Sequence, residues 1–190
     1  VGCEFSQRVT KAFRDKGHDA ISCDIIPTEG NPDWHIQDDV LKHINEGIDL
    51  FIVFPVCRYL CSSGIHWNNK IPGRKEETEK ALKFVKLIMD SPINKIAIEN
   101  PIGVISTRIR KPDQIIQPWW FGENASKATC LWLKNLPKLV PTNIIRKHRY
   151  ANQTASGQNK LPPSDHRWKD RSRTYKLVAE AMASQWSDII

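Results

Sequence analysis

Apolar residues in this chain fall into short runs that follow two periodicities. The continuous apolar run at 50–54 predicts a buried strand, as do the largely apolar stretches at 19–26, 95–98 and 130–133, and residues 1–5 resemble the end of another strand. Spacing of three to four residues predicts helices at 9–16, 76–89 and 175–186, with a short helical turn at 40–45. Because strands and helices alternate, the pattern predicts an α/β fold with a mostly parallel sheet and helices on both faces.

The last quarter of the chain interrupts this alternation. Residues 141–165 are polar and rich in proline, which predicts a loop. We therefore expect three parts: a catalytic core at 1–140, a basic proline-containing segment at 141–176, and a C-terminal helix at 177–190 that packs back on the core.

The composition supports a folded core, and the sequence shows where the net positive charge lies. Of the 190 residues, 40% are hydrophobic and 26% charged, and no apolar run approaches the roughly 18 residues that span a bilayer. The net charge of +7 lies almost wholly in residues 141–176, which hold nine Lys or Arg against two acids. A basic face on a near-neutral body suggests a polyanionic partner, most simply nucleic acid, although a solvated surface would carry the same charge.

Polar residues that are able to bind ligands or to react lie at the carboxyl ends of the predicted strands, where α/β sheets bind ligands. Glu4, Phe5 and Ser6 follow the first strand, and Asp24 ends the second. An acid in that place suits ribose hydroxyls, although Asp24 is equally typical of an ordinary helix cap. The chain has neither a GxGxxG nor a GxxxxGK[ST] sequence, which favours a nucleoside cofactor without a pyrophosphate.

Two later strands end in residues suited to catalysis. Cys57 follows Pro55 at a strand tip, which suits a nucleophile, and Arg58 would favour the thiolate; a buried structural cysteine is the alternative. Glu99 ends the next strand and is a natural proton donor or acceptor. Cys57, Cys61 and His66 lack a convincing fourth zinc ligand. Arg108 and Arg110 suit a phosphate or a base edge, unless they are solvated charges.

Taken in order, these residues resemble the carbon-5 cytosine-specific DNA methyltransferases, in a short phage-type branch without a large target-recognition domain. The Cys57 and Glu99-Asn100-Pro101 motifs carry the resemblance. Residues 3–6 stand where that family has its S-adenosylmethionine loop, and Asp24 and Asp39 match its ribose and adenine acids. Further blocks at 112–114, 121–122, 127–133 and 171–175 resemble the phage branch.

The resemblance implies a Rossmann-like S-adenosylmethionine-dependent methyltransferase fold and a covalent mechanism. Cys57 would add to carbon 6 of cytosine in DNA, and Glu99 would bond ring nitrogen 3. The cofactor-binding residues would be Glu4, Phe5, Ser6, Asp24, Asp39 and Pro55. Arg108 and Arg110 would assist catalysis, and the substrate would be bound by Asn100, Lys127, Arg167, Lys169, Arg171 and Arg173. Trp119 and Trp120 would stack on a flipped base or pack in the core.

The chain departs from that family in its first loop, which reads Phe-Ser-Gln where small residues are usual, and at Val56, where a second proline is common. It also leaves only residues 141–176 for target recognition, so a protein partner or an oligomer would supply the rest. Two alternatives follow: an enzyme that modifies a free pyrimidine nucleotide with the same Cys/Glu pair, and a catalytically weak nucleic-acid-binding protein. Five scattered cysteines favour a reducing cytosol, and the resemblance to the phage branch implies the cytoplasm of a bacterial or phage-infected cell.

Overall fold

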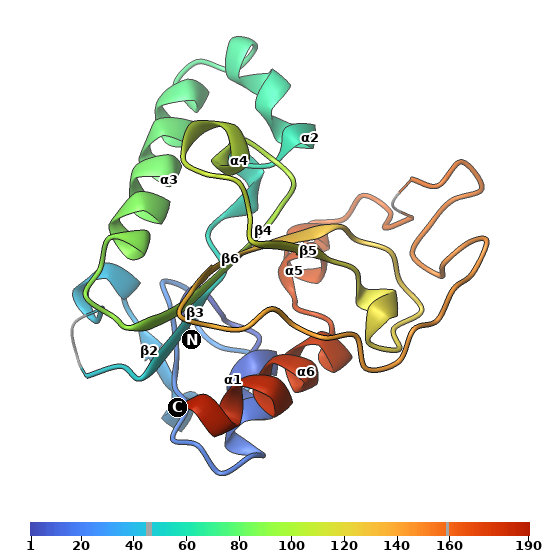
Figure 1. Ribbon diagram of the computed structural model, residues 1–190. Helices are drawn as coiled ribbons and strands as arrows, with labels where there is room; N and C mark the ends of the chain where they lie inside the picture. Colours follow the sequence, from blue (N-terminus) through green and yellow to red (C-terminus); the bar gives the residue numbers. More distant parts are fainter. Residues whose placement is uncertain (45–46, 159) are drawn as a thin grey trace.

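The centre of the molecule is a four-stranded mixed sheet in the order β3-β4-β6-β5 (Figure 1). The computed structural model describes residues 1–44, 47–158 and 160–190. The sheet strands are β3 (Leu50–Val53), β4 (Lys95–Pro101), β5 (Gln114–Ile116) and β6 (Thr129–Lys134). β3 and β4 are parallel, whereas β6 runs antiparallel to both β4 and β5. The predicted α/β class is confirmed, and the sheet is mixed because of β6.

A second parallel pair extends the arrangement on the β3 side. β1 (Ser22–Asp24) pairs with β2 (His35–Gln37), and Gly2 forms parallel bridges to both Cys23 and Val53. The strand order across the molecule is therefore β2, β1, the segment at Gly2, β3, β4, β6 and β5, and β6 alone among these is reversed. The connection from β5 to β6 contains only a 3₁₀ turn at Pro118–Trp120. Such a connection suits antiparallel pairing, which needs no crossover helix.

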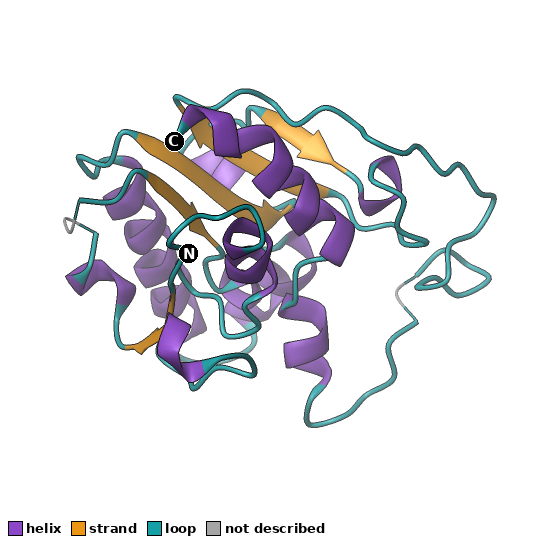
Figure 2. Cartoon of the chain, turned by 90° about the horizontal axis from the view of Figure 1, so that it is seen from below, coloured by secondary structure: helices purple, strands orange, loops and turns teal. Residues whose placement is uncertain are grey.

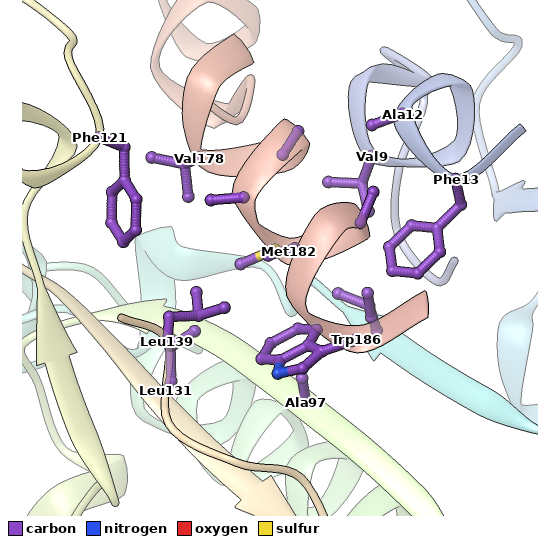
Figure 3. Close-up of a cluster of buried hydrophobic side chains, with 14 of the residues drawn as sticks. Val9, Ala12, Phe13, Ala97, Phe121, Leu131, Leu139, Val178, Met182 and Trp186 are labelled. Atoms are coloured by element: carbon purple, nitrogen blue, oxygen red, sulfur yellow. The ribbon is translucent and has the colours of Figure 1, made fainter. Parts of the chain in front are cut away.

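Helices cover both faces of the sheet, as predicted (Figure 2). On one face lie α1 (Arg8–Arg14) and α6 (Lys176–Trp186), which pack against Ile52, Ala97 and Leu131. Figure 3 shows Met182 and Trp186 of α6 between Ala97 and Leu131 of the sheet and Val9 and Phe13 of α1. On the other face α3 (Arg74–Met89) packs against the residues that alternate with them, Phe51, Val53, Ile96, Ile98 and Trp132. This alternation is the two-residue period of strands buried on both faces.

Short elements complete the chain: α2 (Ser62–Ile65), α4 (Ile105–Arg108), α5 (Arg167–Ser172), and 3₁₀ turns at Pro32–Trp34, Val40–Lys42, Cys57–Tyr59, His66–Asn69 and Ser187–Ile189. Within the described residues, no helix is both long and apolar enough to cross a membrane.

Most predicted elements are confirmed with shifted ends. The helices at 9–16, 76–89 and 175–186 are α1, α3 and α6, and the strands at 19–26, 50–54, 95–98 and 130–133 are β1, β3, β4 and β6. The strand predicted at 1–5 is reduced to a bridge at Gly2, because Cys3 adopts a left-handed φ of 55°. The turn predicted at 40–45 is a 3₁₀ turn at Val40–Lys42, and Asn45 lies outside the described residues. Apart from residue 159, which is also outside them, 141–165 contains no helix or strand.

Candidate active site

Cys57 lies at the start of a tight turn that directly follows β3. Pro55 before it is buried and Val56 is exposed, so the chain leaves the core between these two residues. The Cys57 carbonyl accepts hydrogen bonds from the backbone N–H groups of Leu60 (3.0 Å) and Cys61 (2.9 Å). Leu60 is fully buried, which anchors the far side of the turn in the core. The thiol is thus held on a folded turn at the carboxyl end of β3.

The end of β4 is fastened to this turn. The buried Asn100 side chain donates from Nδ2 to the Pro55 carbonyl at 2.8 Å. Farther along, the Ser62 N–H donates to the Ile102 carbonyl (3.0 Å), and the Val104 N–H donates to the Leu60 carbonyl (2.8 Å). These contacts join the Cys57 turn to the Glu99 strand along its length.

Glycine is required where the two segments meet. A Cβ atom on Gly103 would lie 1.9 Å from the Leu60 carbonyl oxygen and 2.8 Å from the Cys61 Cα. Both neighbours are backbone atoms, so no side-chain rotation would relieve the clash. The close approach of the two segments therefore depends on the missing side chain of Gly103.

Glu99 borders a small pocket of about 20 Å³ on the α6 side of the sheet. The pocket is formed where β4, β5 and β6 meet the chain around α6, and its lining includes Glu99, Lys127, Thr129, Tyr175, Val178 and Met182. The Thr129 hydroxyl is hydrogen-bonded to the Glu99 carboxyl. In the ladder, Glu99 pairs with Leu131 and Pro101 with Thr129, so the antiparallel β6 brings Thr129 to Glu99.

The charges around Cys57 and Glu99 influence one another. Burial raises the pKa of Glu99, while the Lys127 ammonium and the Thr129 hydrogen bond act to lower it. Burial also raises the pKa of the Cys57 thiol; Cys61 and Glu99 add to that effect, and Lys127 and Arg171 oppose it. Cys57 therefore lies within electrostatic range of Glu99, Lys127 and Arg171, and Glu99 lies within range of Lys127. The expected cation, Arg58, instead lies over the Tyr59 ring at 5.0 Å.

The loop after Gly2 is organised by buried hydrogen bonds. The Glu4 carboxylate accepts from the N–H groups of Val9 (2.6 Å) and Thr10 (3.1 Å) and from the Thr10 hydroxyl (2.7 Å), so it caps the start of α1. The Gln7 amide accepts from the Asn31 N–H (2.7 Å) and donates to the Asn31 carbonyl (2.8 Å). Glu4, a predicted cofactor ligand, is thus a structural cap of the loop, because its carboxylate is turned inward.

The other predicted cofactor residues gather beside this loop. Burial, together with the charges of Asp24 and Asp39, raises the pKa of Cys3 to about 12, which places both acids near Cys3. Burial raises the pKa of Asp24, which also accepts a hydrogen bond from the Phe5 backbone. Asp39 caps the turn at Val40–Lys42 through the Leu41 N–H (3.0 Å). Ser6 is half-buried on the same loop.

The basic residues around α5 lie over this loop. The Phe5 ring contacts the Trp168 ring (centroids 6.0 Å apart) and the cations of Lys169 (5.7 Å) and Arg173 (6.0 Å). Arg173 also pairs with Glu29 at 2.8 Å. The structure therefore ties two predicted substrate-binding residues, Lys169 and Arg173, to the protein itself.

Two other basic residues of this segment stay nearer the pocket or the surface. Arg171 is exposed, and its carbonyl accepts from Lys127 Nζ at 3.2 Å. Arg167 is half-buried on the same short helix. Of the predicted substrate-binding set, Asn100, Lys127 and Arg171 are thus the members that the structure brings to Cys57 and Glu99.

Arg108 and Arg110 are not brought to this site. Arg108 forms a two-pronged pair with Glu79 of α3, at 3.0 and 3.1 Å. Arg110 pairs with Asp113 at 2.8 Å and donates to the Leu133 carbonyl. Neither residue is among the described residues that line the Glu99 pocket. Their place follows from α4, which turns the chain after Pro101 toward the α3 side of the sheet.

Sequence reasoning missed Thr129, Tyr175 and Asn152 around the pocket. Asn152 donates to the Tyr175 hydroxyl at 3.4 Å, and burial raises the pKa of that hydroxyl. Of these, only Thr129 has a signal in the sequence, as a polar residue directly before an apolar run. Of the two tryptophans, Trp120 packs against the core and Trp119 stacks on Tyr150. Among the described residues, no group of three or more His, Cys, Asp and Glu could hold a metal ion.

Comparison with known proteins adds no relative. No family model matches the chain, and no curated protein matches its sequence.

Proposed function

We propose that this protein is an S-adenosylmethionine-dependent methyltransferase that acts on carbon 5 of cytosine in DNA. The observation that carries the proposal is that Asn100 ties the Cys57 turn to the end of β4. The Lys127 ammonium acts to lower the pKa of both Cys57 and Glu99 at this joint. A thiol, a carboxyl and a cation in that arrangement suit covalent addition to an electron-poor ring.

The strand order supports a Rossmann-like fold for this activity. β2, β1, the Gly2 segment, β3 and β4 follow the order 3-2-1-4-5 of doubly wound sheets, in which ligands bind where the order reverses. Here the reversal lies between the Gly2 segment and β3, beside residues 4–7 and Pro55. The reversed strand β6 departs from the all-parallel form.

The residues beside this reversal fit a nucleoside cofactor. Asp24 and Asp39 offer two carboxylates within electrostatic range of Cys3, and carboxylates are acceptors for ribose hydroxyls and for the amino group of a purine. S-adenosylmethionine would supply the methyl group there. Phe5, Ser6 and Pro55 would form the wall between the cofactor and Cys57.

The chain's own residues account for the remaining steps. The Cys57 thiolate adds to carbon 6 of the ring, and the Glu99 carboxyl, whose pKa burial raises, donates a hydrogen bond to ring nitrogen 3 in its protonated form. Carbon 5 thereby becomes nucleophilic and accepts the methyl group. A base then removes the carbon-5 proton, and the thiolate leaves carbon 6. A duplex target must be flipped out, at a cost of a few kcal/mol.

The test is a trapped complex. A DNA duplex that carries 5-fluorocytosine cannot lose the carbon-5 proton, so we expect a covalent adduct with the protein that requires S-adenosylmethionine. Cys57→Ser should form no adduct and should show no methyl transfer, because a serine hydroxyl is far less nucleophilic than a thiolate. Mass spectrometry of the adduct and of labelled nucleosides measures both results.

Cys61→Ser is the matched control, since Cys61 lies one turn away and its thiol contacts the Ser63 hydroxyl at 3.3 Å. It should trap DNA as the unchanged protein does. An adduct through Cys61, or full methylation by Cys57→Ser, would overturn the assignment. Trapping of 5-fluorodeoxycytidine monophosphate but not of DNA would move the substrate to a free nucleotide.

A further inference from the structure

The loop between β6 and α5 is a braced arm that projects from the body of the molecule in both whole-chain views (Figures 1 and 2). We call its described residues 143–158 and 160 the arm. Its base is joined to residues 119–126 by three backbone bonds: Asn143 to Trp120, Ile145 to Trp119, and Ala151 to Asn124. In addition, the Asn152 side chain both donates to and accepts from the Ser126 backbone, at 2.8 and 3.0 Å.

The basic part of the arm is a turn folded around Tyr150. The Tyr150 ring stacks on Trp119, with centroids 6.2 Å apart and planes at 19°. Its hydroxyl donates to the Ile145 carbonyl at 3.2 Å, which closes the turn. The turn itself reads Arg-Lys-His-Arg at 146–149, and these residues are exposed. A stacked tyrosine thus holds a cluster of cations on a fixed base.

A fourth cation joins the cluster at an open pocket. The Lys160 N–H donates to the Asn152 carbonyl at 2.9 Å, which returns the chain to the turn. Arg149 and Lys160 line a pocket of about 350 Å³ with Asn124, Tyr150, Gln153 and Thr154, and no carboxylate is among its described lining residues. Residues 141–164 include no Asp or Glu at all. The pocket and the turn therefore suit an anion.

The cations of the arm differ from Arg173 near α5 because, among the described residues, they form no ion pair. Within the described chain, the side chains of Arg146, Lys147, Arg149 and Lys160 form no ion pair, whereas Arg173 is paired with Glu29. Arg173 would have to give up that pair to contact a phosphate. The four arm cations have no such contact to lose.

We propose that the arm is the phosphate-binding surface for the nucleic-acid substrate, with the backbone of a DNA strand lying across the turn at 146–149 and a phosphate in the Arg149–Lys160 pocket. The proposal rests on the proposed function for the identity of the polymer. The arm adjoins the candidate site: Asn152 reaches the Tyr175 hydroxyl, which lines the Glu99 pocket. A strand held on the arm would therefore lead to Glu99.

The experiment measures binding separately from catalysis. Fluorescence anisotropy of a labelled 20-base-pair duplex is recorded over a range of salt concentrations, in the Cys57→Ser background. A variant with Arg146, Lys147, Arg149 and Lys160 all changed to Gln should bind more than tenfold more weakly at low salt. The slope of log affinity against log salt should fall by up to about 3.6, at about 0.9 for each lost phosphate contact.

Two variants with the same loss of charge serve as controls. One changes the exposed Lys16, Lys75, Lys83 and Lys86 to Gln, and the other changes Arg167, Lys169, Arg171 and Arg173 to Gln. The first should retain almost all of the salt slope, and the second should lose less of it than the arm variant, because Lys169 and Arg173 are engaged with Phe5 and Glu29. An equal loss of slope in the first control, or a larger loss in the second than in the arm variant, would overturn the proposal. So would arm-dependent binding to anionic vesicles with no binding to the duplex.

Failure of the arm proposal and failure of the proposed function are distinguishable. If the duplex is methylated and the arm variant binds it normally, the function stands and the arm proposal fails. If no methylation occurs but the arm variant loses duplex binding, the arm proposal stands without the enzymatic function.

Discussion

At the scale of single residues, Lys127 holds the central place in the candidate site. It lines the Glu99 pocket, acts to lower the pKa of both Glu99 and Cys57, and donates to the Arg171 carbonyl. Burial works in the opposite direction on both groups and is the larger influence. Lys127 therefore favours the Cys57 thiolate against the larger effect of burial, a role that the resemblance alone does not assign.

Replacing Lys127 by Met should slow the reaction of Cys57 with iodoacetamide. Only the thiolate reacts, and its pKa is raised by burial, so the rate should climb with pH through the neutral range into the alkaline range. Without the ammonium, that pKa should rise further and the whole profile should move to higher pH, with a several-fold slower rate at pH 7.5. Peptide mass spectrometry measures alkylation of Cys57 against that of Cys61.

Lys16→Met is the control, because Lys16 is exposed beyond the end of α1. It should leave the profile of Cys57 unchanged. If Lys127→Met also leaves the profile unchanged, the Lys127 charge does not influence the pKa of the Cys57 thiol.

At the scale of elements, the joint between the Cys57 turn and the end of β4 depends on Gly103. Gly103→Ala should destabilise the protein by about 1–3 kcal/mol, because its Cβ would overlap the Leu60 carbonyl. It should also expose the turn, so that Cys57 becomes more reactive to a bulky maleimide. Chemical denaturation and maleimide labelling measure the two effects.

Gly17→Ala separates this clash from backbone strain. Gly17 has a φ of +94°, and nothing lies within 4 Å of the position of its Cβ. It should cost about 1–2 kcal/mol through strain alone and leave the labelling of Cys57 unchanged. Increased labelling in both variants would show that general loosening, and not the joint, protects the thiol.

The attachment of α5 to the body is a second property of an element. Arg173 and Glu29 are both partly exposed, with 24% and 34% of their side chains accessible, so their pair should contribute at most about 1 kcal/mol. Arg173→Gln should nevertheless loosen α5 and raise the rate of tryptic cleavage after Lys169 and Arg171. Glu29→Gln should do the same, and the double variant should add little to either.

Lys11→Gln removes the exposed Lys11–Asp15 pair of α1 and should leave this cleavage unchanged. Additive effects of the Arg173 and Glu29 changes would mean that the two side chains stabilise α5 independently.

At the scale of the whole molecule, α6 closes the core that α1 and the sheet share. Trp186 is fully buried, and its indole N–H donates to the Pro137 carbonyl at 3.1 Å. Trp186→Ala should cost about 3–5 kcal/mol, which for a chain of this size lowers Tm by roughly 10 °C. Trp67→Ala, at a tryptophan that is 44% exposed, should lower it far less. Similar losses in thermal melts would show that α6 contributes little to the core.

The sequence predicts the parts of this architecture that depend on burial. Leu50–Val53 and the apolar part of β4 are continuous hydrophobic runs, so both strands and the polar residues after them could be located. β2 and β5 have three residues each and little apolar pattern, and α5 has no buried residue, so these elements left no such signal.

The sequence predicts the site residues that lie at strand ends, but it does not predict those whose position depends on how the strands pair. Cys57 comes shortly after β3, and Glu99 directly follows the predicted strand at 95–98 and lies near the end of β4. Thr129 comes to Glu99 only because β6 pairs antiparallel with β4, a direction that apolar runs do not encode. Arg108 and Arg110 are near Glu99 in sequence, but the chain turns through α4 and places Arg108 against Glu79. Nearness along the chain gave no information about that turn.

The hydrogen bond between Asn100 and Pro55 has a consequence for how the protein can vary. Val53 pairs with Ile98, so the next two residues of β4 point to opposite faces: Glu99 toward the pocket near Met182, and Asn100 toward the Pro55 carbonyl. Removing one residue within β4 would exchange these directions, since side chains alternate at every step of a strand. The carboxyl would then meet a carbonyl, and the amide would enter the pocket. The loops around the site can gain or lose single residues. In contrast, β4 keeps Glu99 directed toward the pocket and Asn100 toward Pro55 only if its length changes by two residues at a time.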